Sequence, residues 1–170
     1  MKKKEFKVED KLRLILVGNP NSGKSTLFNS LTGLNQRIGN FPGVTVEKKI
    51  GSVKINYQID AEVIDLPGTY SLSPRSEDER VTFEYLSDNT RTDLPELIVV
   101  VADASNLKRN LLLATQLIDS EQPTILVLNM MDVVERNKQN IDIEKLQKRL
   151  GIPVVPMNAR LGKGTKELKA

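Results

Sequence analysis

Apolar residues along this chain gather in short runs that alternate with amphipathic segments. Four runs have the length and composition of strands buried on both faces, at residues 12–17, 97–102, 124–128 and 154–155. Two further strand-like runs, at residues 46–53 and 55–64, are separated by a short turn and predict a β-hairpin. The pattern therefore predicts an α/β domain. We expect a mostly parallel six-stranded sheet with one antiparallel edge strand and helices on both faces.

The segments between these strands predict helices. We expect helices at residues 25–31, 79–86, 107–120 and 142–150, and the start of another at 161. Residues 34–45 show no period and predict a long loop, which inside a compact domain is often functional. The whole pattern fits one domain over residues 11–170, preceded by a flexible basic N-terminus at residues 1–10.

Composition narrows the chemistry that this domain can perform. The 170 residues include no cysteine and no histidine, which excludes disulfides, thiolate or imidazole metal ligands and Ser-His-Asp triads. The formal net charge of +3 comes partly from lysines near both ends, so we expect no nucleic-acid partner. No apolar run approaches the roughly 18 residues of a membrane helix, and we expect a soluble chain. Any chemistry must therefore use carboxylates, hydroxyls, lysine, backbone groups and bound ions.

The phosphate-binding pattern G-x-x-x-x-G-K-[ST] lies between the first strand and the first helix. Such a loop turns consecutive N–H groups toward phosphate oxygens, while its lysine adds a charge and its hydroxyl ligates Mg²⁺. A glycine turn with a surface lysine is the alternative. The candidate nucleotide-binding residues here are Asn19, Pro20, Asn21, Ser22, Gly23, Lys24, Ser25 and Thr26.

Asp65-Leu66-Pro67-Gly68 follows the second strand of the predicted hairpin, at a carboxyl end where ligands of such sheets bind. Asp65 is a candidate ligand of Mg²⁺ together with Ser25, and the hydroxyl of Thr45 at the end of the long loop is the third. Gly68 can bring its N–H against a terminal phosphate. An ordinary strand-end turn is the alternative.

Asn129-Met130-Met131-Asp132 follows the next-to-last strand. A carboxylate at Asp132 can accept two hydrogen bonds from guanine, and adenine offers no such pair of donors. The alternative is that Asp132 only caps the helix after it. Near the last strand, Asn158, Ala159 and Arg160 form a weaker candidate, in which the N–H of Ala159 donates to the guanine carbonyl.

These motifs, with Gly39-Asn-Phe-Pro-Gly-Val-Thr-Val-Glu47, resemble the N-terminal G domain of the bacterial ferrous iron transport protein B family, within the Ras-like P-loop GTPases. The resemblance implies a Ras-like P-loop G domain, a Mg²⁺-dependent GTPase that binds GTP and GDP. It also implies a place on the cytoplasmic face of the inner membrane, in a longer transporter whose helical and transmembrane parts are its partners.

The chain departs from the common pattern at several positions. Met130 replaces a lysine and Asn158 a serine, so we expect weaker base contacts and fast nucleotide exchange. Thr69 stands where Ras-like proteins carry a water-positioning glutamine, so we expect weak intrinsic hydrolysis. Asn21 resembles a K⁺ ligand of potassium-stimulated G proteins, which makes K⁺ a possible activator.

We therefore assign the catalytic roles to Lys24, Asn21, Thr45 and Gly68. Two alternatives stay open. The first is a slow switch that docks a partner according to the bound nucleotide. The second is an RNA- or ribosome-associated GTPase.

Overall fold

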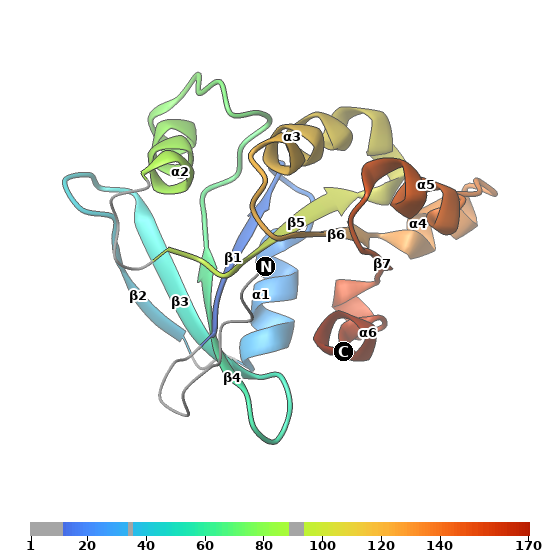
Figure 1. Ribbon diagram of the computed structural model, residues 1–170, viewed down its shortest axis with the longest axis horizontal. Coiled ribbons are helices and arrows are strands. Elements are labelled where there is room, and N and C mark those ends of the chain that lie inside the picture. Colours follow the sequence, from blue (N-terminus) through green and yellow to red (C-terminus); the bar gives the residue numbers. More distant parts are fainter. Residues whose placement is uncertain (1–11, 34–35, 89–93) are drawn as a thin grey trace.

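A seven-stranded sheet in the order β2-β3-β4-β1-β5-β6-β7 forms the centre of the computed structural model, which describes residues 12–33, 36–88 and 94–170 (Figure 1). Strands β4, β1, β5, β6 and β7 are parallel, whereas β3 runs antiparallel to both β2 and β4. The strands are β1 (Leu12–Gly18), β2 (Gln36–Asn40), β3 (Glu47–Lys54), β4 (Asp60–Asp65), β5 (Leu97–Asp103), β6 (Thr124–Asn129) and β7 (Val154–Pro156).

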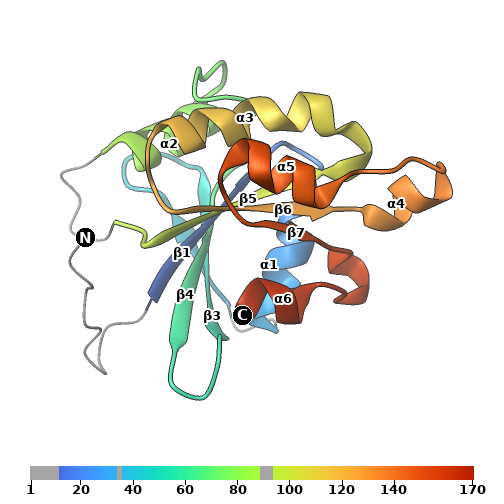
Figure 2. The same cartoon turned by 45° about the vertical axis from the view of Figure 1, so that its right-hand side comes forward.

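Helices cover both faces of the sheet (Figure 2). They are α1 (Lys24–Thr32), α2 (Glu77–Ser87), α3 (Leu107–Asp119), α4 (Met131–Arg136), α5 (Ile143–Leu150) and α6 (Thr165–Lys169), with 3₁₀ turns η1 (Ala104–Asn106) and η2 (Ala159–Leu161). Alternate residues of β1 divide between two cores. Ile15 and Val17 pack with residues of α2 and α3, while Leu14 and Leu16 pack with Leu27 and Phe28 of α1.

The α/β class, the parallel centre and the hairpin are confirmed, but the strand count was wrong by one. Residues 36–40 form β2 inside the segment predicted as a long loop, and they add a second antiparallel pair. This strand has a single large apolar residue, Ile38, whose side chain is exposed, so its sequence lacks the alternation that marks a half-buried strand. The N-terminal residues 1–10 lie outside the described residues.

The predicted helix boundaries hold where the caps have a clear mechanism. Gly33 ends α1 and Gly151 ends α5, both with positive φ. Asp142 caps α5 by accepting a hydrogen bond from the N–H of Lys145. Helix α2 begins at Glu77, two residues earlier than expected, because Ser76 caps it. Among the residues that the structure describes, no helix is long and apolar enough to cross a bilayer.

Candidate functional site

A cavity of about 620 Å³ lies at the carboxyl ends of the parallel strands, where the phosphate-loop pattern, the D-x-x-G pattern and the N-x-x-D pattern meet. Seven of its lining residues belong to the loop and the start of α1, and Gly68 and Met130 come from the other two patterns. Asp78 in the first turn of α2 also lines it, and the sequence analysis missed this residue. The lining residues are Asn19, Pro20, Asn21, Gly23, Lys24, Ser25, Thr26, Gly68, Asp78 and Met130.

The phosphate-loop pattern adopts a strained turn that only particular residues permit. Asn21 and Gly23 both have positive φ, of 64° and 85°. A Cβ on Gly23 would collide with Nδ2 of Asn129, so only glycine fits. Helix α1 begins directly afterwards without a side-chain cap, which leaves its first N–H groups directed to the cavity. This geometry provides a site for an anion.

Two side chains of this loop have buried polar atoms without a hydrogen-bond partner among the described residues. They are the amide of Asn19 and the hydroxyl of Ser22, and the two residues are 4% and 1% exposed. Buried polar groups are normally satisfied, so these are groups that water or a bound molecule would complete.

Lys24 and Asp65 form an ion pair at the floor of the site. Both side chains are buried, and the ammonium of Lys24 donates to Oδ1 of Asp65. The hydroxyl of Ser25 lies 3.4 Å from Oδ2 of the same carboxylate. A hydroxyl beside a carboxylate is a donor set that Mg²⁺ accepts, so these residues fit the predicted metal. Thr45 is exposed and does not line this cavity, and its role as a ligand stays a prediction.

Gly68 lies directly against the phosphate-binding loop. A Cβ at this position would meet three atoms of Pro20 at 3.1–3.2 Å. The next residue, Thr69, donates its N–H to the carbonyl of Gly18 at 3.0 Å. The hydroxyl of Thr69 donates to the carbonyl of Ser71 at 2.7 Å and is buried. The one proton of this hydroxyl is therefore engaged, which leaves only its oxygen lone pairs to contact a water molecule.

The buried side chain of Asn129 connects three parts of the site. Its Nδ2 donates to the carbonyl of Ser22 at 3.0 Å, and its Oδ1 accepts from the N–H of Ala159 at 2.9 Å. The second bond differs from expectation, because the N–H assigned to the guanine carbonyl is directed to Asn129 instead. The side chain of Asn158 caps η2 by accepting a hydrogen bond from the N–H of Leu161, and Arg160 is exposed.

Met130 has a φ of 63° and is itself the N-cap residue of α4, so the alternative in which Asp132 caps that helix is wrong. Asp132 lies in the first turn of α4 and forms an ion pair with Arg136 at 3.2 Å. The side chain of Asp132 is 45% exposed and does not line the cavity that Met130 lines, and its contact with a base stays a prediction.

The sequence model of the family described as ferrous iron transport protein B matches residues 12–170. The chain is 47% identical over 156 residues to the Fe(2+) transporter FeoB of Leptospira biflexa, which covers 92% of this chain and 22% of that protein. The corresponding Salmonella typhimurium protein is 46% identical over 164 residues, or 94% of this chain and 20% of that protein. The chain thus spans about a fifth of the length of these relatives.

Solved structures give the same result for the fold. The cytosolic domain of L. pneumophila FeoB matches with a TM-score of 0.86 and 43% identity, over 92% of this chain and 65% of that chain. The G domain of the T. maritima FeoB iron transporter matches with a TM-score of 0.83 and 39% identity, over 94% of this chain and 95% of that chain. A mutant of S. thermophilus NFeoB bound to mGDP matches with a TM-score of 0.84 and 45% identity, over 94% of this chain and 59% of that chain.

Proposed function

Because this chain belongs to the family of ferrous iron transport protein B, we propose that it binds GTP and GDP and hydrolyses GTP with Mg²⁺. The observation that carries the proposal is one cavity that is lined both by Lys24 and Ser25 of the phosphate loop and by Met130 of the N-x-x-D pattern. A triphosphate fits beside the phosphate loop and a purine beside Met130. Solved S. thermophilus relatives bound to GDP or mGDP support the nucleotide-binding part of this proposal.

At the phosphate end, the turn at Asn21 to Gly23 directs main-chain N–H groups to the β- and γ-phosphates. Lys24 would exchange its contact with Asp65 for the phosphate oxygens, which would leave the carboxylate of Asp65 available to Mg²⁺. Ser25, Asp65 and Thr45 would hold Mg²⁺, which neutralises the charge that develops between the β- and γ-phosphates. Gly68 packs tightly against Pro20, and its N–H, with no side chain in the way, would donate to the terminal phosphate.

At the base end, Asp132 accepts hydrogen bonds from the N1–H and the exocyclic amine of guanine. Asn129 holds the loop that carries Ser22 and the loop that carries Ala159 in a fixed relation. Met130 provides an apolar surface for the purine ring, in place of a lysine stem. An adenine base would leave the carboxylate of Asp132 facing an acceptor, which favours guanine.

Intrinsic hydrolysis is proposed to be slow, since the hydroxyl of Thr69 is engaged by Ser71. We propose that K⁺ compensates in part, held beside the phosphates by Asn21, which is exposed at the mouth of the cavity. Hydrolysis should be compared in potassium and in sodium buffer for the wild type and for Asn21→Ala. Equal rates in all four conditions would exclude this role for K⁺.

The relatives named as Fe(2+) transporters suggest the physiological setting. We propose that the domain works on the cytoplasmic face of the membrane and regulates or drives ferrous iron uptake by the rest of the same polypeptide. A slow switch that docks a partner according to its nucleotide is the second candidate. It is favoured by the engagement of the Thr69 hydroxyl, which predicts that bound GTP is hydrolysed slowly.

Calorimetric titration of the purified chain with GTP, GDP and ATP tests the nucleotide assignment. We expect GTP and GDP to bind and ATP to bind at least about 100-fold more weakly. Comparable binding of ATP, or the absence of binding by any of the three, would overturn the proposal.

A further inference from the structure

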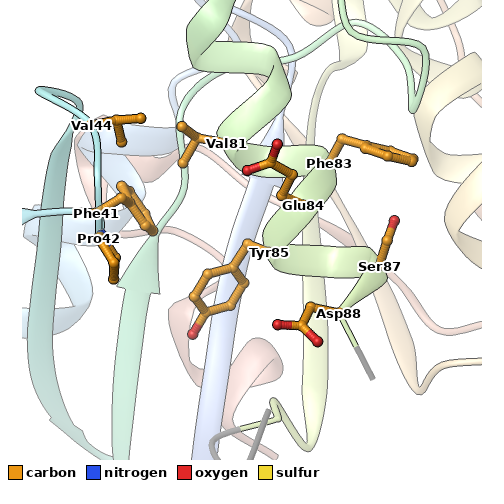
Figure 3. Close-up of a pocket in the computed structure, with 9 residues that line it drawn as sticks. All are labelled: Phe41, Pro42, Val44, Val81, Phe83, Glu84, Tyr85, Ser87 and Asp88. Atoms are coloured by element: carbon orange, nitrogen blue, oxygen red, sulfur yellow. The ribbon is translucent and has the colours of Figure 1, made fainter. Parts of the chain in front are cut away.

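A second cavity, of about 490 Å³, lies between α2 and the loop that leads to Thr45 (Figure 3). It shares no residue with the nucleotide cavity. One wall consists of Phe41, Pro42 and Val44, and the other is the face of α2 that carries Val81 and Tyr85. Its volume falls within the range of cavities that hold ligands or anchoring side chains.

The floor of this cavity is an aromatic pair that is already fixed in place. Phe41 and Tyr85 are almost fully buried, and their rings meet edge to face with centroids 5.9 Å apart. The ammonium of Lys48 lies 5.6 Å and 5.5 Å from the two ring centroids. Since this internal cation already uses the rings, the floor offers an apolar contact rather than a further cation–π site.

The rim of the cavity is acidic. Glu84 of α2 and Asp88, the C-cap residue of this helix, both line it, and Figure 3 shows their carboxylates on either side of the Tyr85 backbone. Within residues 77–88 there are five acidic side chains and one arginine, although the whole chain has a net charge of +3. A negative patch on a basic protein attracts cations selectively, and it disfavours anionic lipid or nucleic acid.

We propose that this cavity is a docking site for a protein segment in which one large apolar side chain is flanked by lysine or arginine. The apolar side chain enters between Val44 and Val81 and rests on the Phe41–Tyr85 pair. Its basic neighbours face Glu84 and Asp88. This inference goes beyond the proposed nucleotide chemistry and does not depend on it. One consequence of the inference does rest on the proposed function. Because Val44 precedes Thr45, a bound segment would restrain the loop that is expected to respond to GTP.

The test uses the ¹⁵N-labelled chain and the synthetic peptide acetyl-Lys-Lys-Leu-Phe-Lys-Lys-amide in an NMR titration. We expect saturable shifts in the amide signals of Phe41, Gly43 and Val44 and of residues 81–88. Glu84→Lys should weaken binding about fivefold, because it reverses a rim charge. Glu77→Lys is the matched control. Glu77 and Glu84 are both exposed and both pair with Arg80, at 3.9 Å and 3.7 Å, but only Glu84 lines the cavity.

Several results would overturn the proposal. The first is an equal loss of binding in Glu84→Lys and Glu77→Lys, which would indicate a diffuse attraction to α2. The second is equal binding of a peptide in which Leu-Phe is replaced by Ser-Ser, since no apolar anchor would then be involved. The third is the absence of saturable shifts in residues 41–44 and 81–88 at peptide concentrations up to about 2 mM.

Discussion

The side-chain amide of Asn129 donates a hydrogen bond to the main-chain carbonyl of Ser22, 107 positions earlier in the chain, at 3.0 Å. The other end of the same amide accepts from the N–H of Ala159 at 2.9 Å. A single buried residue therefore connects the phosphate-binding loop with the loop that carries Ala159, which we propose to lie beside the base. The relative position of the two loops depends on these two bonds.

Replacing Asn129 by alanine should impair both stability and nucleotide binding. The change removes two buried hydrogen bonds, so we expect a loss of about 1–3 kcal/mol in the free energy of unfolding. We expect the affinity for GDP, measured by calorimetry, to fall at least about tenfold because the two loops separate.

Asn110→Ala is the matched control for Asn129→Ala. Asn110 is equally buried, and its side chain also makes two hydrogen bonds, from the N–H of Asp103 and to the carbonyl of Asn106. It should lower stability by a similar amount without a comparable change in affinity. If both variants bind GDP equally well, Asn129 does not organise the site.

The ion pair between Lys24 and Asp65 predicts a coupled effect on stability. Lys24→Met keeps the apolar stem but leaves a buried carboxylate without its partner. We expect the free energy of unfolding in urea, without nucleotide, to fall by about 3 kcal/mol.

The double variant Lys24→Met, Asp65→Asn should be more stable than Lys24→Met alone, because the amide of asparagine needs no counter-charge. Strictly additive losses in this cycle would show that the pair contributes no coupling energy.

Base selection should change with the charge at position 132. Asp132→Asn replaces an acceptor by a group that also donates, so GDP binding should weaken by about 10- to 100-fold. Binding of xanthosine diphosphate should improve, because xanthine carries a carbonyl where guanine carries an amine. Competition against labelled GDP measures both effects.

Arg136→Ala separates this role of Asp132 from its ion pair. That pair lies at the surface, with side-chain exposures of 72% and 45%, so its loss should change GDP affinity less than about threefold. If Asp132→Asn and Arg136→Ala behave alike, Asp132 acts through Arg136 and not on the base.

The parts of the site that a sequence reveals are those with a fixed local geometry. The turn around Gly23 and the buried strands before Gly18 and Asp65 follow from steric limits and apolar runs, and the structure brings them together as expected. The edge strand β2 could not be recognised, because its pairing with β3 is set by tertiary contact and its one large apolar residue faces solvent.

Two contacts at the site differ from the sequence-based expectation, because they depend on tertiary structure and not on local geometry. The N–H of Ala159 turned out to serve Asn129, 30 positions away, and Asp78 reaches the cavity from a helix that starts earlier than its periodicity suggested. In the first case the sequence identifies the group but not its partner, since a hydrogen bond between distant loops leaves no periodic signal. In the second case it misses the residue, because the start of α2 depends on the cap at Ser76.

Glu79 should control the segment that follows Gly68. Its Oε1 accepts from the N–H of Tyr70 at 3.2 Å and its Oε2 from the N–H of Arg75 at 2.8 Å, while its own N–H donates to the capping hydroxyl of Ser76. Glu79→Ala releases two main-chain groups, so amide hydrogen exchange at Tyr70 and Arg75 should accelerate about fivefold or more.

Glu77→Ala is the control for Glu79→Ala. It lies in the same helical turn and removes only a surface pair with Arg80, so both exchange rates should stay unchanged. Unaltered exchange in Glu79→Ala would mean that Thr82 and Gln116, which bond to the carbonyl of Pro67 and the N–H of Leu72, hold the segment without it.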